Sequence, residues 1–157
     1  MDVYFLQNIP TLNCLQLQKK IIKKNNDKVS VIFWGTGNPR REFLHSGDLA
    51  SACLFVFENL DFKDLVDDQS KFDRVVKDIR NTHINIGTGK DISIKELVEL
   101  AGDIIGFKGN IGWDSSLPDG TGQKLMDVSK INALGWKESV SLRDGIKLVY
   151  DWYVGSV

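Results

Sequence analysis

The sequence predicts one mixed α/β domain (α+β in its arrangement) that is built from short strands and helices of ordinary length. Its 157 residues give room for one compact domain. Apolar residues make up 42% of the chain and charged residues 26%, which is typical of a globular protein. Segments with the apolar spacing of strands alternate with segments that have the spacing of helices, and no internal repeat is present.

The first 45 residues predict a helix followed by a strand. Residues 11–26 interleave leucines and isoleucines with lysines and end at a polar turn, which indicates a helix. Residues 29–34 (VSVIFW) are rich in β-branched and aromatic side chains, which favour a strand. Glycine and proline in residues 35–39 then require a loop.

The next segment predicts a helix over residues 47–59. Ser46 is placed to cap it, and Asp48 lies in its first turn, where the helix dipole favours a negative charge. Residues 61–80 have the weakest pattern in the chain, and we interpret them as an exposed, partly helical insertion. The predicted helix would bury Leu49, Cys53, Val56 and Phe57.

A strand over residues 83–86 and the best-defined helix of the chain follow. Ser93 and Glu96 form a capping box, which marks the start of this helix. Gly106 is expected to end it. The apolar stripe at helical spacing consists of Ile94, Leu97, Val98, Ala101, Ile104 and Ile105.

The last part of the chain predicts a strand over residues 111–113, a loop over 114–123 and two further helical segments. Ser129 begins a short helical turn. Ser141, with an aspartate three residues later, begins a final helix. The side chains that this last helix would turn inward are Leu142, Ile146, Val149 and Tyr150.

Composition excludes several classes of protein. There are 20 Lys and Arg against 21 Asp and Glu, and this near-neutral balance argues against a dedicated nucleic-acid-binding protein. Cys14 and Cys53 could form at most one bridge, which suits a reducing compartment. Because there is no membrane-length apolar run and no secretory signal, we expect a soluble cytoplasmic protein that does not bind a membrane.

The first 41 residues hold seven Lys and Arg against two Asp, a net charge of +5 that comes mostly from lysines. This pattern indicates either a solvated helix face or an anion-binding patch. The second possibility leaves open a non-catalytic interaction module that binds an anionic partner.

No self-contained catalytic constellation is visible in the sequence. The two Gly-Thr-Gly turns, at residues 35–37 and 87–89, lack the third glycine of a dinucleotide-binding motif. His45 and His83 are the only histidines, too few for a metal site or a Ser-His-Asp triad. No tyrosine has a lysine four residues after it. We therefore predict no catalytic residue, no cofactor-binding residue and no metal site in this chain.

Two stretches could instead bind a nucleotide. In residues 34–45, Trp34 could stack on a base and Arg41 could clamp a diphosphate. The same sequence is also compatible with a tryptophan in the core and an arginine paired with a carboxylate. In residues 116–124, Asp119 and Lys124 place an acid and a base five residues apart on a constrained loop. A plain surface turn would look much the same.

The order of these stretches resembles a known family. WGTGNPRREFLHSGDLA (34–50), HINIGTG (83–89), LPDGTGQKLMD (117–127) and LGW (134–136) are similar to the C-terminal substrate domain of extended short-chain dehydrogenases. Within that NAD-dependent epimerase/dehydratase superfamily, the resemblance is to the GDP-L-fucose synthases. It implies a substrate-binding domain over residues 29–157, preceded by a basic helical lead-in over 1–28, with the Rossmann core missing.

The resemblance also implies a function. Family members convert GDP-4-keto-6-deoxy-mannose to GDP-L-fucose by 3,5-epimerisation and NADPH-dependent reduction at C4. By similarity, the residues that would contact the substrate are Trp34, Arg41, Asp119 and Lys124. Another nucleotide-sugar epimerase or dehydratase is the alternative within the superfamily.

The family's NADP site and its Ser, Tyr-x-x-x-Lys, Cys and His catalytic groups belong to the other half of the protein. This chain alone is therefore expected neither to catalyse the reaction nor to bind the cofactor, unless a Rossmann half or second subunit complements it. The chain also departs from the family pattern H-V-D-D at residues 45–48, where Asp48 is expected to cap or pair locally.

Overall fold

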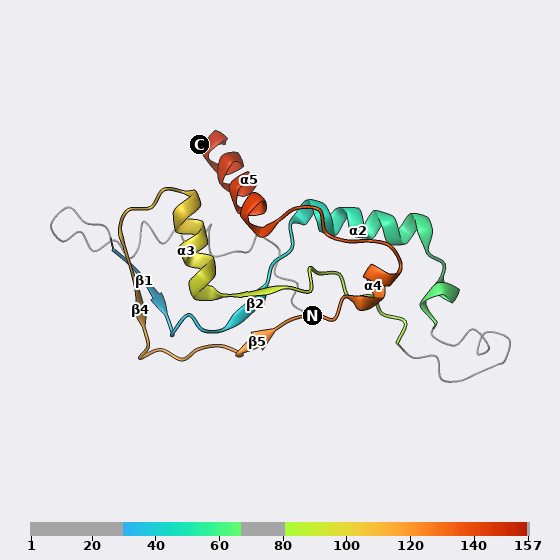
Figure 1. Cartoon of the computed structure of the whole chain (residues 1–157), viewed down its shortest axis with the longest axis horizontal. Helices are drawn as coiled ribbons and strands as arrows, with labels where there is room; N and C mark the ends of the chain where they lie inside the picture. Colours follow the sequence, from blue (N-terminus) through green and yellow to red (C-terminus); the bar gives the residue numbers. More distant parts are fainter. Residues whose placement is uncertain (1–29, 67–80, 157) are drawn as a thin grey trace.

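A computed structural model of the chain describes residues 30–66 and 81–156 (Figure 1). The predicted lead-in over 1–28 and most of the predicted insertion over 61–80 lie outside these ranges. Within them, no helix combines the length and the apolar character that crossing a bilayer requires.

Two small sheets form the centre of the fold. In the first, β1 (Ser30–Trp34) pairs in parallel with β4 (Asn110–Asp114). In the second, β2 (Arg40–Glu42) lies between β3 (Asp91–Ser93), which is antiparallel to it, and β5 (Gln123–Lys124), which is parallel to it. The helical elements are α2 (Ser46–Asn59), the 3₁₀ helix η2 (Phe62–Leu65), α3 (Ile94–Ile104), α4 (Ser129–Ala133) and α5 (Leu142–Gly155). These elements confirm the predicted mixed α/β class.

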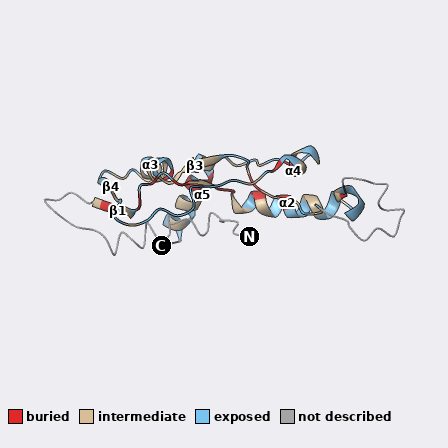
Figure 2. Cartoon of the chain, turned by 90° about the horizontal axis from the view of Figure 1, so that it is seen from below, coloured by how far each residue is buried: buried red, intermediate tan, exposed pale blue. Residues whose placement is uncertain are grey.

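The molecule is elongated and flat, and its core is divided into two clusters (Figures 1 and 2). Phe43 packs with Leu97 of α3 and Ile146 of α5 in the first cluster. Its neighbour Leu44 packs with Ala52 of α2 and Ile131 of α4 in the second. Successive residues of an extended chain point to opposite sides. Phe43 and Leu44, which follow β2, therefore contribute to different clusters and connect them.

Most elements with a strong local pattern are confirmed. Ser93 Oγ accepts a hydrogen bond from the Glu96 amide at 3.1 Å, and the Glu96 carboxylate accepts one from the Ser93 amide at 2.9 Å. Gly106 follows α3 with φ +68°, the left-handed conformation that favours glycine. Ser141 caps α5 by accepting from the Asp144 amide at 3.1 Å.

The start of α2 differs from the prediction. His45 is the N-cap, because its Nδ1 accepts from the Gly47 amide at 3.1 Å, so the expected Ser46 cap is wrong. Asp48 is buried and does not pair locally. Its carboxylate accepts hydrogen bonds from the Ser139 hydroxyl at 2.6 Å and from the Val140 amide at 2.9 Å, more than 90 residues along the chain.

The buried face of α2 also differs. Leu49 and Val56 pack against the second cluster as expected, but Cys53 and Phe57 are exposed, and Phe57 keeps 87% of its surface accessible. The other α2 residues that pack in the second cluster are Ala52 and Phe55. Since apolar residues run almost all the way around this helix, spacing alone could not identify the face that packs.

A further expectation is wrong. Residues 83–86 form no strand in the described structure. Instead, Ile84 and Ile86 pack against the second cluster. The described residues 61–66 of the predicted exposed, partly helical insertion contain η2 and are mostly exposed, but Val66 is buried. Conversely, β2, β3 and β5 were not predicted, because strands of two or three mostly polar residues carry no readable alternation.

Candidate functional site

The loops that follow β1 and β4 are joined by the carboxylate of Asp119. Its two oxygens accept hydrogen bonds from the Thr36 amide at 2.8 Å and from the Thr36 hydroxyl at 2.6 Å. Both bonds hold the pKa of Asp119 below its usual range, and the bond from the hydroxyl has the larger effect. At the base of the same junction, the Gly35 amide donates to the Asp114 carbonyl at 2.9 Å. The structure thus brings Asp119 to the end of β1, beside Trp34.

Glycine is required at both ends of the 35–37 turn. Gly35 and Gly37 have φ +79° and +77°, in the left-handed region that side chains rarely adopt. A Cβ at Gly35 would collide with the Asp119 carboxylate, and one at Gly37 would lie 2.7 Å from the Trp113 ring. Conformation and close packing therefore both explain the Trp-Gly-Thr-Gly sequence.

Trp34 lies at the end of β1 and keeps 74% of its surface exposed. Its neighbour Phe33 is turned to the other face of the strand, where its ring lies 5.3 Å from that of Trp113. The alternative in which Trp34 is a core residue is therefore wrong. An exposed indole beside a polar loop is available to stack on a ligand.

Arg41 lies in the middle of β2. Its Nη1 donates to the Arg40 carbonyl at 2.7 Å, and its Nη2 would be 3.4 Å from a Cβ placed on Gly120. The guanidinium therefore reaches the loop that carries Asp119. Among residues 30–66 and 81–156, no carboxylate forms an ion pair with it.

Lys124 is the direct neighbour of Arg41 in the sheet. The parallel pairing of β2 with β5 puts Arg41 opposite Lys124 and Arg40 opposite Gln123. Residues opposite each other in a sheet project from the same face, so the two predicted cations share one face. All four predicted binding residues thus lie around one junction, formed by the ends of β1, β2, β5 and the loop over 114–122.

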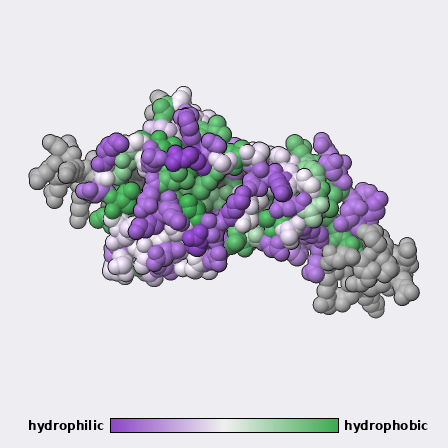
Figure 3. All heavy atoms as spheres, viewed as in Figure 1, coloured by the Kyte–Doolittle hydropathy of each residue, from purple (hydrophilic) through white to green (hydrophobic). Residues whose placement is uncertain are grey.

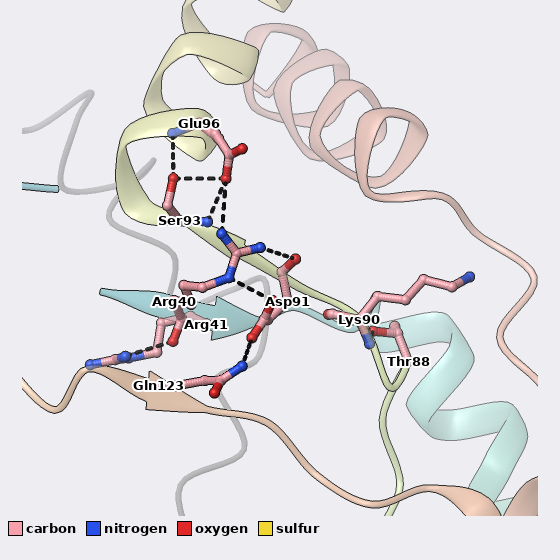
Figure 4. Close-up of polar contacts among 8 residues, drawn as sticks. All are labelled: Arg40, Arg41, Thr88, Lys90, Asp91, Ser93, Glu96 and Gln123. Atoms are coloured by element: carbon pink, nitrogen blue, oxygen red, sulfur yellow. Dashed lines mark hydrogen bonds and ion pairs between the residues drawn. The ribbon is translucent and has the colours of Figure 1, made fainter. Parts of the chain in front are cut away.

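On the other face, Arg40 is bound to a carboxylate that is largely shielded from solvent (Figure 4). Its Nε lies 2.8 Å from Oδ1 of Asp91, whose side chain is only 10% exposed, and the second Asp91 oxygen accepts from the Gln123 amide. Hydrogen bonds from Gln123 and Arg40 hold the pKa of Asp91 below its usual range. The Arg40 guanidinium also lies 3.5 Å from Glu96 at the start of α3. Sequence reasoning missed this network, since its members are 51 and 32 residues apart.

Glu42 organises the second Gly-Thr-Gly turn. Its Oε1 accepts from the Thr88 and Gly89 amides at 2.5 and 2.6 Å, and its Oε2 accepts from the Met126 amide at 3.0 Å. The backbone amides that would donate to a phosphate in a phosphate-binding turn therefore donate to the Glu42 carboxylate instead. Sequence reasoning missed Glu42 as well, because a single glutamate carries no local signal.

The hydrogen bonds at the two Gly-Thr-Gly turns also bear on whether a dinucleotide cofactor could bind there. Asp119 occupies the Thr36 amide of the first Gly-Thr-Gly turn, just as Glu42 occupies the amides of the second. A diphosphate would have to displace an anionic group at either turn, so these turns do not fit the diphosphate of NADP. In the described part of the chain, no three His, Cys, Asp or Glu side chains are arranged to hold a metal ion.

Several known proteins are similar to this chain in sequence and in fold. The model of the NAD dependent epimerase/dehydratase family matches residues 15–87. GDP-L-fucose synthase 1 of Arabidopsis thaliana is 46% identical over 134 residues, which is 85% of this chain and 36% of that protein.

Two solved structures from Campylobacter jejuni are similar. A GDP-6-OMe-4-keto-L-xylo-heptose reductase superposes with a TM-score of 0.73 at 43% identity, over 92% of this chain and 43% of that one. A GDP-mannoheptose C4 reductase with NADP bound gives 0.70 at 40% identity, over 96% and 46%.

The chain thus spans less than half the length of these relatives. The similarity nevertheless extends over most of this chain, and it confirms the resemblance predicted from the sequence. The chain is similar in sequence to the NAD-dependent epimerase/dehydratase family and, among its members, to the GDP-L-fucose synthases.

Proposed function

We propose that residues 29–157 form the nucleotide-sugar-binding domain of a GDP-L-fucose synthase-like enzyme. The observation that carries the proposal is the pairing of Arg41 with Lys124 across β2 and β5, beside the exposed Trp34 and the Asp119 loop. These residues would hold the GDP part of a GDP-sugar, which is the substrate type named for the relatives.

Each side chain has a distinct role in this proposal. Arg41 offers a planar fork of donors that matches phosphate oxygens, and Lys124 adds a second positive charge on the same face. Trp34 offers a ring face for the base. Because the nucleotide is remote from the reacting sugar carbons, its binding serves to orient the sugar.

Asp119 has two tasks. Each of its oxygens accepts one hydrogen bond from Thr36 and retains a further lone pair. A carboxylate can accept from the N–H groups on the edge of guanine, which uracil and thymine do not present in the same arrangement. The loop connection and the choice of base would then depend on one residue.

The reaction of the whole enzyme is part of the proposal. It is the 3,5-epimerisation and NADPH-dependent 4-reduction of GDP-4-keto-6-deoxy-mannose, in a soluble cytoplasmic protein. The cofactor and the proton-transferring groups would come from a Rossmann half or second subunit. The present chain would supply substrate binding.

Titration with GDP-, UDP- and dTDP-sugars tests the proposal. We expect GDP and GDP-sugars to raise the Tm of the chain, and Arg41→Ala to remove most of that rise. Lys147→Ala is the matched control, because Lys147 forms an exposed ion pair with Asp151 on α5. Stabilisation by UDP-sugars without stabilisation by GDP would refute the guanine assignment.

A further inference from the structure

β5 has little backbone pairing to hold it in place. It consists of only two residues, and the pairing with β2 covers only Arg40↔Gln123 and Arg41↔Lys124. One further backbone bond, from the Arg40 amide to the Gly122 carbonyl at 2.7 Å, lies at its start. A strand this short is marginal on its own, so its position depends on side chains.

Those side chains lie on the face opposite Arg41. Figure 4 shows Arg40 and Gln123 converging on the Asp91 carboxylate, while Arg41 points away from it. One Asp91 oxygen accepts from Arg40 Nε at 2.8 Å, and the other accepts from the Gln123 amide. Asp91 therefore ties β3 to both β2 and β5, and it is nearly buried while doing so.

We propose that Gln123 and Asp91 are positioning residues for the nucleotide site: their hydrogen bond fixes β5 against β2 and thereby sets the spacing of Arg41 and Lys124. The inference rests on the proposed function and adds to it two residues that do not touch the ligand. A diphosphate has a fixed distance between its phosphates, so two cations bind it well only when their spacing is held.

The polarity of the bond supplies a test. Gln123→Met keeps the length and the neutral charge of the side chain but removes its donor, and Gln123→Glu places two carboxylates opposite each other. The double variant Asp91→Asn with Gln123→Glu restores a donor opposite an acceptor, and the carbonyl oxygen of the amide introduced by Asp91→Asn can still accept from Arg40. Lys90→Gln is the control, because it breaks only the exposed ion pair with Glu138 beside Asp91.

The measurement is the Kd of the full chain for GDP by calorimetric titration, with the Tm of each variant recorded separately. We expect Gln123→Met and Gln123→Glu each to weaken binding about tenfold, the double variant to recover most of the loss of Gln123→Glu, and Lys90→Gln to bind like the wild type. A simple charge effect predicts otherwise. Gln123→Met leaves the charge unchanged and would then bind an anion like the wild type.

Three outcomes overturn the inference. Unchanged GDP affinity in folded Gln123→Met, or in folded Gln123→Glu, would show that the hydrogen bond does not position the cations. Failure of the double variant to recover affinity would do the same. In each of these cases the wild type still binds GDP and the proposed function stands. If the wild type itself does not bind GDP, the proposed function fails together with the inference.

Discussion

Asp119 and Thr36 are 83 residues apart in the sequence and are joined by two hydrogen bonds, at 2.8 and 2.6 Å. This pair connects the loop after β1 to the loop after β4. The β1–β4 pairing alone would leave the two loops free to separate beyond Trp34 and Asp114. The residues proposed to meet the base, Trp34 and Asp119, are held together by this link.

The first prediction concerns that link. Thr36→Val keeps the backbone amide and the shape of the side chain but removes the 2.6 Å hydrogen bond. We expect GDP affinity to fall about threefold to tenfold, because the loop that carries Asp119 loses one of its two tethers. Thr36→Ser retains the hydroxyl and should bind like the wild type. Thr121→Val, in an exposed part of the same loop, is the control. Equal affinity of Thr36→Val and the wild type in calorimetric titration would contradict this role.

The second prediction concerns the glycines of the 35–37 turn. Gly37→Ala places a Cβ 2.7 Å from the Trp113 ring at φ +77° and should destabilise the fold by about 1–3 kcal/mol in urea unfolding. Gly122→Ala should be nearly neutral, since no atom lies within 4 Å of its added Cβ. If the two variants have the same midpoint of unfolding, the turn does not need its left-handed conformation.

How far the sequence could predict the structure depends on where each stabilising contact comes from. The β1 strand, α3 and its capping box, and the Gly106 end were predictable because their signals lie within a few neighbouring residues. The four residues predicted to bind the substrate also lie around one junction, and their binding of a ligand stays a prediction.

The remaining features could not be predicted, because their partners are distant in the sequence. Glu42 binds amides 46 and 84 residues away, and Asp48 binds residues 91 and 92 positions away. Nothing beside either acid in the sequence indicates these partners. The prediction of the buried face of α2 was partly wrong for another reason, because the apolar residues of this helix fit more than one stripe.

The third prediction concerns Asp48. Removing the buried side chain in Asp48→Ala leaves the Ser139 hydroxyl and the Val140 amide without their acceptor, which should cost about 1–3 kcal/mol. Asp103→Ala removes only an exposed ion pair with Arg143 and should cost about 0–1 kcal/mol. Urea unfolding of the two variants checks this difference. Equal losses would mean that the Asp48 contacts contribute no more than a surface pair.

The same residue predicts a pH dependence. Burial by itself would raise the pKa of Asp48, but hydrogen bonds from Ser139 and Val140 outweigh it and leave the pKa below the ordinary value. A carboxylate with a lowered folded-state pKa stabilises the fold above its unfolded pKa. That contribution is lost as pH falls through the folded value. The difference in unfolding free energy between wild type and Asp48→Ala should therefore be full near neutral pH and shrink in acid. A difference that grows as pH falls would contradict the assignment.

The last prediction concerns the outer face of α2. Leu54 and Phe57 are 60% and 87% exposed, on the side of the helix turned away from Ala52. Further apolar side chains are exposed on α5, at Leu148 and Trp152, and Figure 3 shows hydrophobic surface over the α3 and α5 region. Such neighbouring apolar side chains favour association, so the isolated chain should form dimers or larger species as its concentration rises.

Sedimentation velocity over a concentration series measures that association. Phe57→Glu should shift the distribution toward monomer, because it places a charge in the face that becomes buried. It should leave the Tm nearly unchanged, since Phe57 contributes little to the core. Glu58→Gln, one position further on an exposed side of α2, is the control and should associate like the wild type. A wild type that stays monomeric at every concentration would refute the prediction. Association that persists in Phe57→Glu would instead locate the contact on α5, where Trp152→Glu should then abolish it.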